Sequence, residues 1–195
     1  GPGGEAHHSV RRPPSVCRAW GDALLGGRRA GRWPAVGETV VDPAVYASAA
    51  TAVPSAAAVP VLVDAGWLVG AALLVARPCL DAVGPFDERF FLYSEDTDYC
   101  LRARAARWRC VLAPAASMIH AGGDSQDDAT RRAHLAANRV RLYGRGRGWP
   151  RTVAFGAGVL ANEVLRSPTR PECRASTRRL AGAAARAVLA PRRRG

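Results

Sequence analysis

The segment FDERFFLYSEDTDYC, residues 86–100, is the most informative part of this chain of 195 residues. It surrounds an aromatic run with carboxylates, namely Asp87, Glu88, Glu95, Asp96 and Asp98 around Phe90, Phe91 and Tyr93. Ser94 is a suitable N-cap, and a helix that begins there carries three acids in its first turn, where unpaired amides and the helix dipole favour negative charge. The alternative is a carboxylate cluster at a loop-to-helix junction that presents a general base. Spacing alone favours the acid-rich first turn over the catalytic interpretation.

Outside this segment the chain alternates between apolar runs and helical patterns. The apolar runs predict strands at residues 59–63, 66–75, 109–113 and 117–120. Cap residues and apolar periodicity predict helices at residues 16–25, 78–83, 95–107, 127–143, 149–165 and 172–189. Residues 32–58 are rich in Ala, Pro and Gly and predict a loop, and the GRGRG of residues 144–148 predicts a hinge between two helices. The chain is therefore expected to be of the α/β class.

Charge is unevenly distributed along the chain. All 28 basic residues are Arg and the net charge is +12. Residues 131–195 hold 16 Arg against Glu163 and Glu172, which leaves a nearly neutral body of 12 Arg and 14 acids in residues 1–130. Such a basic tail suits a phosphate-rich partner, either an anionic membrane surface or nucleic acid, although no nucleic-acid reading motif accompanies it. The last predicted helix is amphipathic and basic, which is typical of attachment to a membrane interface, with an ordinary solvated helix as the alternative.

The cysteines and the hydropathy indicate the setting of the protein. Five scattered Cys with no C-x-x-C pair favour neither a disulfide framework nor a zinc knuckle, and indicate a reducing, cytosolic location. No apolar run reaches the roughly 18 residues of a spanning helix, so we expect the chain not to cross a membrane by itself.

Two further sites carry candidate functional residues. His120 follows a predicted strand and precedes a glycine turn, and its spacing alone favours a solvated or structural His over a metal ligand. Gly70 and Ala71 are small residues inside a predicted strand, where a ligand or another backbone can approach closely, although tight packing explains them equally well.

Residues 67–125 read WLVGAALLVARPCLDAVGPFDERFFLYSEDTDYCLRARAARWRCVLAPAASMIHAGGDS. They contain a small-residue strand, then the pattern G-x-F-D-E-x-F-F-x-Y-x-E-D-x-D-x-x-x-R, then a strand pair that ends in His. This order resembles the second half of a GT-A glycosyltransferase of family 2, and more narrowly its bacterial rhamnosyltransferase-like branch. The matching positions are Gly84, Phe86, Asp87, Glu88, Phe90, Phe91, Tyr93, Glu95, Asp96, Asp98, Arg102 and His120. Two departures are Pro85, where a second Gly is usual, and Ala106 with Arg107, where Ala-Gly is usual.

The resemblance implies an inverting sugar transfer. Asp96 would be the general base that deprotonates an acceptor hydroxyl as it attacks the anomeric carbon of a nucleotide sugar, with Glu95 beside it. Glu95 and Asp98 would help to place the acceptor and to hold the base, and Trp67, Gly70 and Ala71 would line the acceptor side. Asp87, Glu88 and Arg102 would support the site. His120 would join a divalent metal, Mg²⁺ or Mn²⁺, bound to the departing nucleoside diphosphate.

The resemblance also implies the partners and the organisation of the chain. The donor would be a nucleotide sugar such as dTDP-rhamnose, and the acceptor a glycan or a prenyl-diphosphate-linked sugar, met at the cytoplasmic face of the plasma membrane by residues 131–195. Residues 1–58 would be a lead-in from a donor-binding half, residues 59–125 the acceptor-side core of a GT-A mixed-sheet fold, and residues 126–195 a basic helical tail.

The Asp-x-Asp metal motif of the donor half does not occur upstream of Trp67. The expectation is therefore an incomplete metal site in a truncated chain that is not active alone, with the donor half supplied by a longer chain or by another chain. A homo-oligomer is a separate expectation. Two alternatives stay open at this point: a non-catalytic interaction module that keeps a glycosyltransferase-derived fold, and an Arg-rich nucleic-acid-binding protein.

Overall fold

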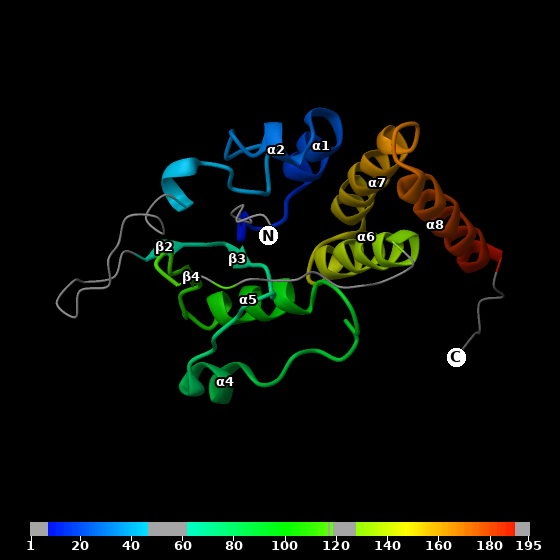
Figure 1. Ribbon diagram of the computed structural model, residues 1–195. Coiled ribbons are helices and arrows are strands. Elements are labelled where there is room, and N and C mark those ends of the chain that lie inside the picture. Colours follow the sequence, from blue (N-terminus) through cyan, green and yellow to red (C-terminus); the bar gives the residue numbers. More distant parts are fainter. Residues whose placement is uncertain (1–7, 47–61, 117, 119–127, 190–195) are drawn as a thin grey trace, which may run out of the picture.

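The computed structural model describes residues 8–46, 62–116, 118 and 128–189, the last of these ranges with residues 128 and 181–189 as backbone. Its named helices are α1 (Val16–Leu25), α2 (Gly27–Ala30), α4 (Arg77–Val83), α5 (Glu95–Ala105), α6 (Asp128–Gly144), α7 (Trp149–Arg166) and α8 (Pro171–Leu189). Its strands are β1 (Val10–Arg11), β2 (Val63–Asp64), β3 (Trp67–Leu68) and β4 (Val111–Leu112). Figure 1 shows α4 and α5 beneath the strands and α1 and α2 above them, with α6, α7 and α8 on the right.

The strands form two antiparallel ladders of two strands each, β1 with β3 and β2 with β4. The mixed α/β class is confirmed, but the strands expected at residues 66–75 and 109–113 are much shorter, at Trp67–Leu68 and Val111–Leu112. Most of the strand expected at residues 59–63 lies outside the described residues, and β2 contains its last residue, Val63. The run at residues 66–75 ends early because its partner β1 offers only Val10 and Arg11, after which Gly70 N–H bonds the Asp96 side chain instead of a neighbouring strand. The strand expected at residues 117–120 lies outside the described residues apart from Met118.

The predicted helices are confirmed to within about two residues at most ends. Helix α5 ends at Ala105 rather than at Arg107, because Arg107 adopts a φ of 67° and Trp108 N–H donates to Ala103 O at 2.9 Å. This is the left-handed helix ending that Gly normally occupies. Position 107, where the family pattern usually has Gly, is therefore occupied by Arg in this chain, and its backbone still adopts the left-handed conformation that favours Gly.

Two larger clusters and one smaller cluster of buried side chains hold the elements together. Ala19 of α1, Ala136 and Tyr143 of α6, and Phe155 and Val159 of α7 make the helical cluster, in which the Tyr143 and Phe155 rings stack at 4.0 Å. A second cluster joins the strands to α5 (Val10, Ala65, Cys100, Cys110), and a third joins α4 to α5 (Cys79, Tyr99, Ala103). The expected lead-in and tail therefore share a core, since α1 packs on α7.

None of the described helices is both long enough and apolar enough to cross a bilayer.

Candidate active site at the start of helix α5

The turn that leads into α5 is held in an unusual backbone conformation. Tyr93 and Ser94 have φ values of 68° and 73°, in the left-handed region that non-glycine residues rarely adopt. Ser94 is the N-cap residue of α5 and three acids lie in the first turn, as expected, but the Ser94 hydroxyl makes no capping hydrogen bond. A capping side chain needs an extended backbone, and Ser94 is left-handed. Asn138 of α6 holds this turn instead, since its Nδ2 donates to Leu92 O at 2.8 Å and to Tyr93 O at 3.0 Å.

Replacing Asn138 by Ala is expected to lower the free energy of unfolding by about 1–3 kcal/mol, because the side chain is buried and two carbonyls lose their donor. Urea unfolding followed by circular dichroism measures the change. The neighbouring exposed Ala137→Ser is the matched control on the same helix, and we expect it to change stability by less than about 0.5 kcal/mol. Equal stabilities of the two variants would contradict the role of Asn138.

Asp96 lies in the first turn of α5 with its carboxylate oriented by three donors. Thr97 N–H and Oγ1–H donate to Oδ1 at 2.6 and 3.2 Å, and Gly70 N–H donates to Oδ2 at 2.8 Å. A Cβ on residue 70 would lie 3.0 Å from the Asp96 Cβ, so a larger residue at this position would have to push the Asp96 side chain aside. Gly70 and Ala71 are exposed, and Oδ2 keeps a second lone pair beyond the one that Gly70 occupies. The carboxylate is therefore fixed in place and still able to accept a proton at the surface.

Glu95 precedes Asp96 and lies in a less hydrated position. Its Oε2 is buried and takes no hydrogen bond from the described residues. Burial, and then the negative charge of Asp96, raise the pKa of Glu95 above its usual range. The ionised form of Glu95 therefore lowers the stability of the fold. Carboxylates with a raised pKa of this kind are common at catalytic sites.

We expect Glu95→Gln to stabilise the fold at neutral pH. Because the folded pKa of Glu95 is raised, its ionisation lowers stability as the pH rises through the ordinary carboxyl range of about 4.3, whereas Gln cannot ionise. The melting temperature of the variant should exceed that of the wild type at pH 7, and the two should converge at pH 3. Glu88→Gln, at an exposed carboxylate, is the control. A similar gain from both substitutions would show that net charge, rather than the site, is responsible.

The other two carboxylates of this region, Asp87 and Asp98, are bridged by one arginine. Arg145 donates from Nη2 to Asp87 Oδ2 at 2.6 Å and from Nη1 to Asp98 Oδ1 at 2.7 Å. Its guanidinium also lies 4.5 Å from the centre of the Phe90 ring. The Asp98 side chain is only 4% exposed, so Arg145 neutralises a buried charge.

Two further arginines complete this network. Arg102 Nε donates to Asp98 Oδ2 at 2.8 Å, and its Nη atoms reach Val83 O and Pro85 O, which ties α5 to the end of α4. Arg89 pairs with Asp87 at 2.9 Å from an exposed position. The hydrogen bonds from Arg89, and to a smaller extent the one from Arg145, hold the pKa of Asp87 well below its usual range. These ion pairs and hydrogen bonds therefore hold the segment that precedes α5, and the first turns of α5, in one conformation.

The structure brings together only some of the predicted site residues. Asp96, Glu95 and Gly70 meet at the start of α5, with Ala71 exposed beside them. Trp67 lies in the strand cluster, and its Nε1 donates to Arg12 O at 3.1 Å. Asp98 is buried among arginines, and His120 lies outside the described residues.

Sequence reasoning missed Arg145 and Asn138. Arg145 belongs to the GRGRG segment interpreted as a hinge, and nothing in its spacing connects it to carboxylates 47 and 58 residues away. The signal that the sequence offers for Asn138 is an uncharged amide within an Arg-rich helix.

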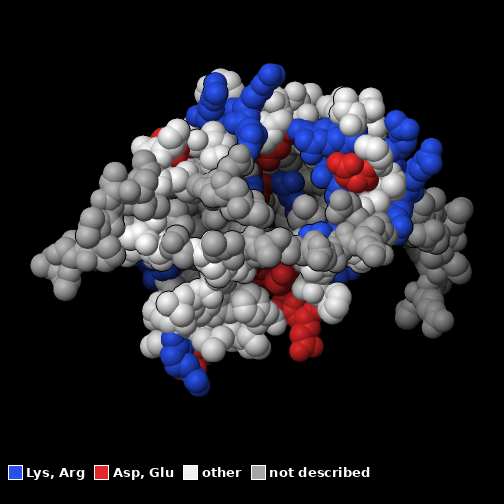
Figure 2. Space-filling view, in the orientation of Figure 1, with Lys and Arg blue, Asp and Glu red and all other residues white. Residues whose placement is uncertain are grey.

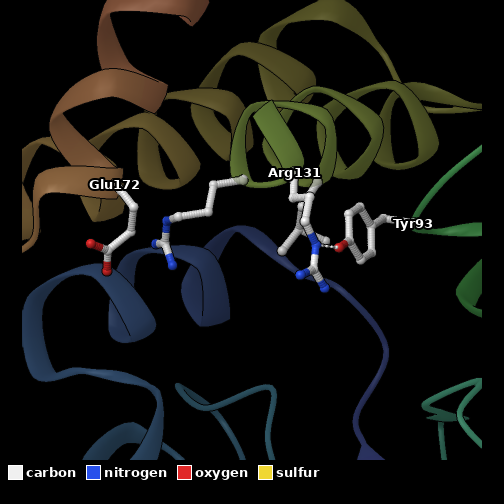
Figure 3. Close-up of a pocket in the computed structure, with 5 residues that line it drawn as sticks. Tyr93, Arg131 and Glu172 are labelled. Carbon is white, nitrogen blue, oxygen red and sulfur yellow. Dashed lines mark hydrogen bonds between the residues drawn. The ribbon is translucent and has the colours of Figure 1, made fainter. Parts of the chain in front are cut away.

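A cavity of about 280 Å³ opens beside Tyr93 between α6 and α8, lined by Tyr93, Arg131, Arg132, Leu135 and Glu172. Figure 3 shows Arg131 at the Tyr93 ring and Glu172 on the opposite side. Arg131 Nε donates to the Tyr93 hydroxyl, and Arg132 forms two hydrogen bonds with buried Glu163, at 3.1 and 2.8 Å. The guanidinium groups of this cavity thus already have protein partners, and they connect the turn before α5 to the helices of the tail.

Within the described residues, no group of three His, Cys, Asp or Glu side chains is arranged to hold a metal ion. The described donors thus do not fit a metal site by themselves, and the metal role of His120 stays a prediction.

The chain is similar to a glycosyltransferase. The relatives it matches are the N-acetylglucosaminyl-diphospho-decaprenol L-rhamnosyltransferase of Mycobacterium tuberculosis strain CDC 1551 and the protein of the same description from strain H37Rv. Each is 35% identical over 144 residues, which cover 73% of this chain and 41% of the relative. The chain therefore spans about two fifths of the length of these proteins. No protein-family model matches the chain, and no solved structure matches it.

Proposed function

We propose that this chain provides the acceptor side of an inverting glycosyltransferase, which moves a sugar such as rhamnose from a nucleotide sugar to a glycan or a prenyl-diphosphate-linked acceptor. The observation that carries the proposal is the Asp96 carboxylate, held by Gly70 and Thr97 at an exposed edge with a free lone pair. The similarity to a rhamnosyltransferase that is named for a decaprenol-linked acceptor supports the choice of substrates.

In the proposed reaction Asp96 Oδ2 takes the proton of an acceptor hydroxyl. The hydroxyl oxygen forms a bond to the anomeric carbon, and the bond from that carbon to the diphosphate oxygen breaks on the opposite face, which inverts the centre. Gly70 and Thr97 keep the carboxylate in position for this transfer. Arg145 and Arg102 hold the start of α5 through Asp98 and act as positioning residues.

A divalent metal, Mg²⁺ or Mn²⁺, would neutralise charge on the departing diphosphate, and His120 is the residue of this chain proposed to contact it. No step above depends on the metal. The proposal also places the protein at the cytoplasmic face of a membrane, where residues 131–195 meet anionic lipid and the acceptor is presented.

Two measurements test the proposal. The chain as printed is titrated by calorimetry with dTDP-rhamnose and with prenyl-diphosphate-linked N-acetylglucosamine, with and without Mn²⁺. The longest natural form of the protein is then assayed for transfer of labelled rhamnose. Acceptor binding together with transfer supports the proposal. Absence of binding and of transfer would instead favour a non-catalytic interaction module.

A further inference from the structure

The outer face of α7 is apolar along its whole length. Between Thr152 and Arg166 the exposed positions are Val153, Ala157, Leu160, Val164 and Leu165. Four of them are large, with exposed fractions of 58% for Val153, 43% for Leu160, 45% for Val164 and 55% for Leu165. The inner face of the same helix is also apolar, with Phe155 and Val159 in the helical cluster. A helix with apolar residues on two opposite faces is normally covered on both of them.

Helix α1 extends this apolar face. Trp20 Nε1 donates to Ala154 O of α7 at 3.0 Å, and its ring edge packs at Gly158, where a Cβ would lie 3.1 Å from Trp20 Cδ1. Trp20 is still 38% exposed, and Leu24, one turn further along α1, is 67% exposed. At the first residue of α7, Trp149 is 76% exposed. We call the exposed set on the two helices the α1/α7 face; it consists of Trp20, Leu24, Trp149, Val153, Ala157, Leu160, Val164 and Leu165.

Arginines surround the α1/α7 face. Exposed arginines follow α1 and flank both ends of α7, namely Arg28, Arg29, Arg32, Arg147, Arg151 and Arg170. Figure 2 shows basic side chains along the upper edge, over α1 and α2, and on the right around α7 and α8. The two carboxylates of these helices do not offset this charge at the surface. Asp22 is half-buried, and Glu163 is 7% exposed and paired with Arg132.

We propose that the α1/α7 face docks on the surface of an anionic lipid bilayer. Apolar side chains would enter the interface between headgroups and acyl chains, Trp149 and Trp20 would lie at headgroup level, and the surrounding arginines would meet lipid phosphates. The charges select this occupant over a second copy of the chain, because two such faces in contact would bring their arginines together. The docking surface thus includes α1, outside the basic tail, and does not depend on the basic residues of α8.

The test is co-sedimentation of the 195-residue chain with vesicles of phosphatidylglycerol and phosphatidylcholine, and with vesicles of phosphatidylcholine alone. We expect binding to the anionic vesicles only. The double variant Leu160→Gln with Val164→Gln keeps the net charge and should weaken binding by about tenfold. The matched control, Leu74→Gln with Leu80→Gln, changes two exposed leucines on the side of α4 and should stay within about twofold of the wild type.

Several outcomes would overturn the inference. Equal binding by the α7 variant and the wild type would mean adsorption through arginine alone, and equal weakening by both variants would mean no specific face. A wild-type dimer that the α7 variant converts to a monomer, without vesicle binding, would assign the face to a second copy. Circular dichroism confirms that each variant is folded. Asp96 is unchanged throughout, so these results are independent of the proposed transfer reaction.

Discussion

Replacing Asp96 by Asn is expected to lower the rate of sugar transfer by about 10²–10⁴-fold, the usual contribution of a general base. An amide has nearly the shape of a carboxylate but cannot take the proton of the acceptor hydroxyl. One end of the Asn side chain would also present N–H₂ toward Gly70 N–H or Thr97 N–H, so one of the present hydrogen bonds would be lost. The loss should fall on kcat, because nothing in this substitution touches the donor.

The measurement is steady-state transfer by the longest natural form of the protein, with kcat and KM determined separately for donor and acceptor. Asp81→Asn is the matched control, since Asp81 is an exposed carboxylate on α4 that pairs with Arg77. The control should retain full activity. Turnover by Asp96→Asn at a rate close to that of the wild type would remove Asp96 as the base.

Replacing Arg145 by Met is expected to lower the free energy of unfolding by about 2–4 kcal/mol. The substitution leaves buried Asp98 with Arg102 as its cation, and it removes the contact of the guanidinium with the Phe90 ring. Arg89→Met is the matched control because Arg89 also pairs with Asp87 but is 74% exposed, and an exposed pair contributes less than about 1 kcal/mol. Urea unfolding of the two variants beside the wild type measures the difference.

The effect of Arg145 should also depend on pH. The lowered pKa of Asp87 means that its ion pairs stabilise the fold above the ordinary carboxyl range of about 4, and that this stability is lost as the pH falls below it. The gap in melting temperature between wild type and Arg145→Met should therefore be wide at pH 7, smaller at pH 3, and smallest once the pH has fallen through the lowered pKa of Asp87. A gap that is the same at both pH values would show that packing on Phe90, rather than charge, explains the destabilisation.

The helices of this protein could be predicted from local signals, and most of the strands could not. Pro150 at the start of α7, the acidic first turn of α5 and apolar periodicity locate helix ends without reference to the rest of the chain. A strand exists only where a partner pairs with it, and in the described structure the run after Leu68 keeps a single backbone bond to its neighbour, from Val69 N–H to Ser9 O. The apolar character of residues 69–75 is therefore no guide to their backbone.

In the candidate site, too, some residues could be predicted from local sequence signals, whereas others depend on contacts with distant parts of the chain. The ordered pattern around Asp96 predicts this carboxylate as the base, and the structure shows that the small residue at position 70 permits a close approach to it. The left-handed backbone of Tyr93 and Ser94 could not be foreseen, because Asn138 of another helix stabilises it. Arg145 is likewise a partner that only the fold brings near.

The link from Arg145 to Asp87 and Asp98 has a consequence for recombination. Helices α6, α7 and α8 look exchangeable because they follow the carboxylate segment as a separate basic block, yet α6 supplies the amide that fixes the turn, and the loop after it supplies the shared cation. A chimera joined between α5 and α6 would leave Asp87 and Asp98 without this counterion unless the incoming part carries an Arg at the position of Arg145. Homologous parts can be exchanged only if Asn138 and Arg145 are inherited together with Asp87 and Asp98.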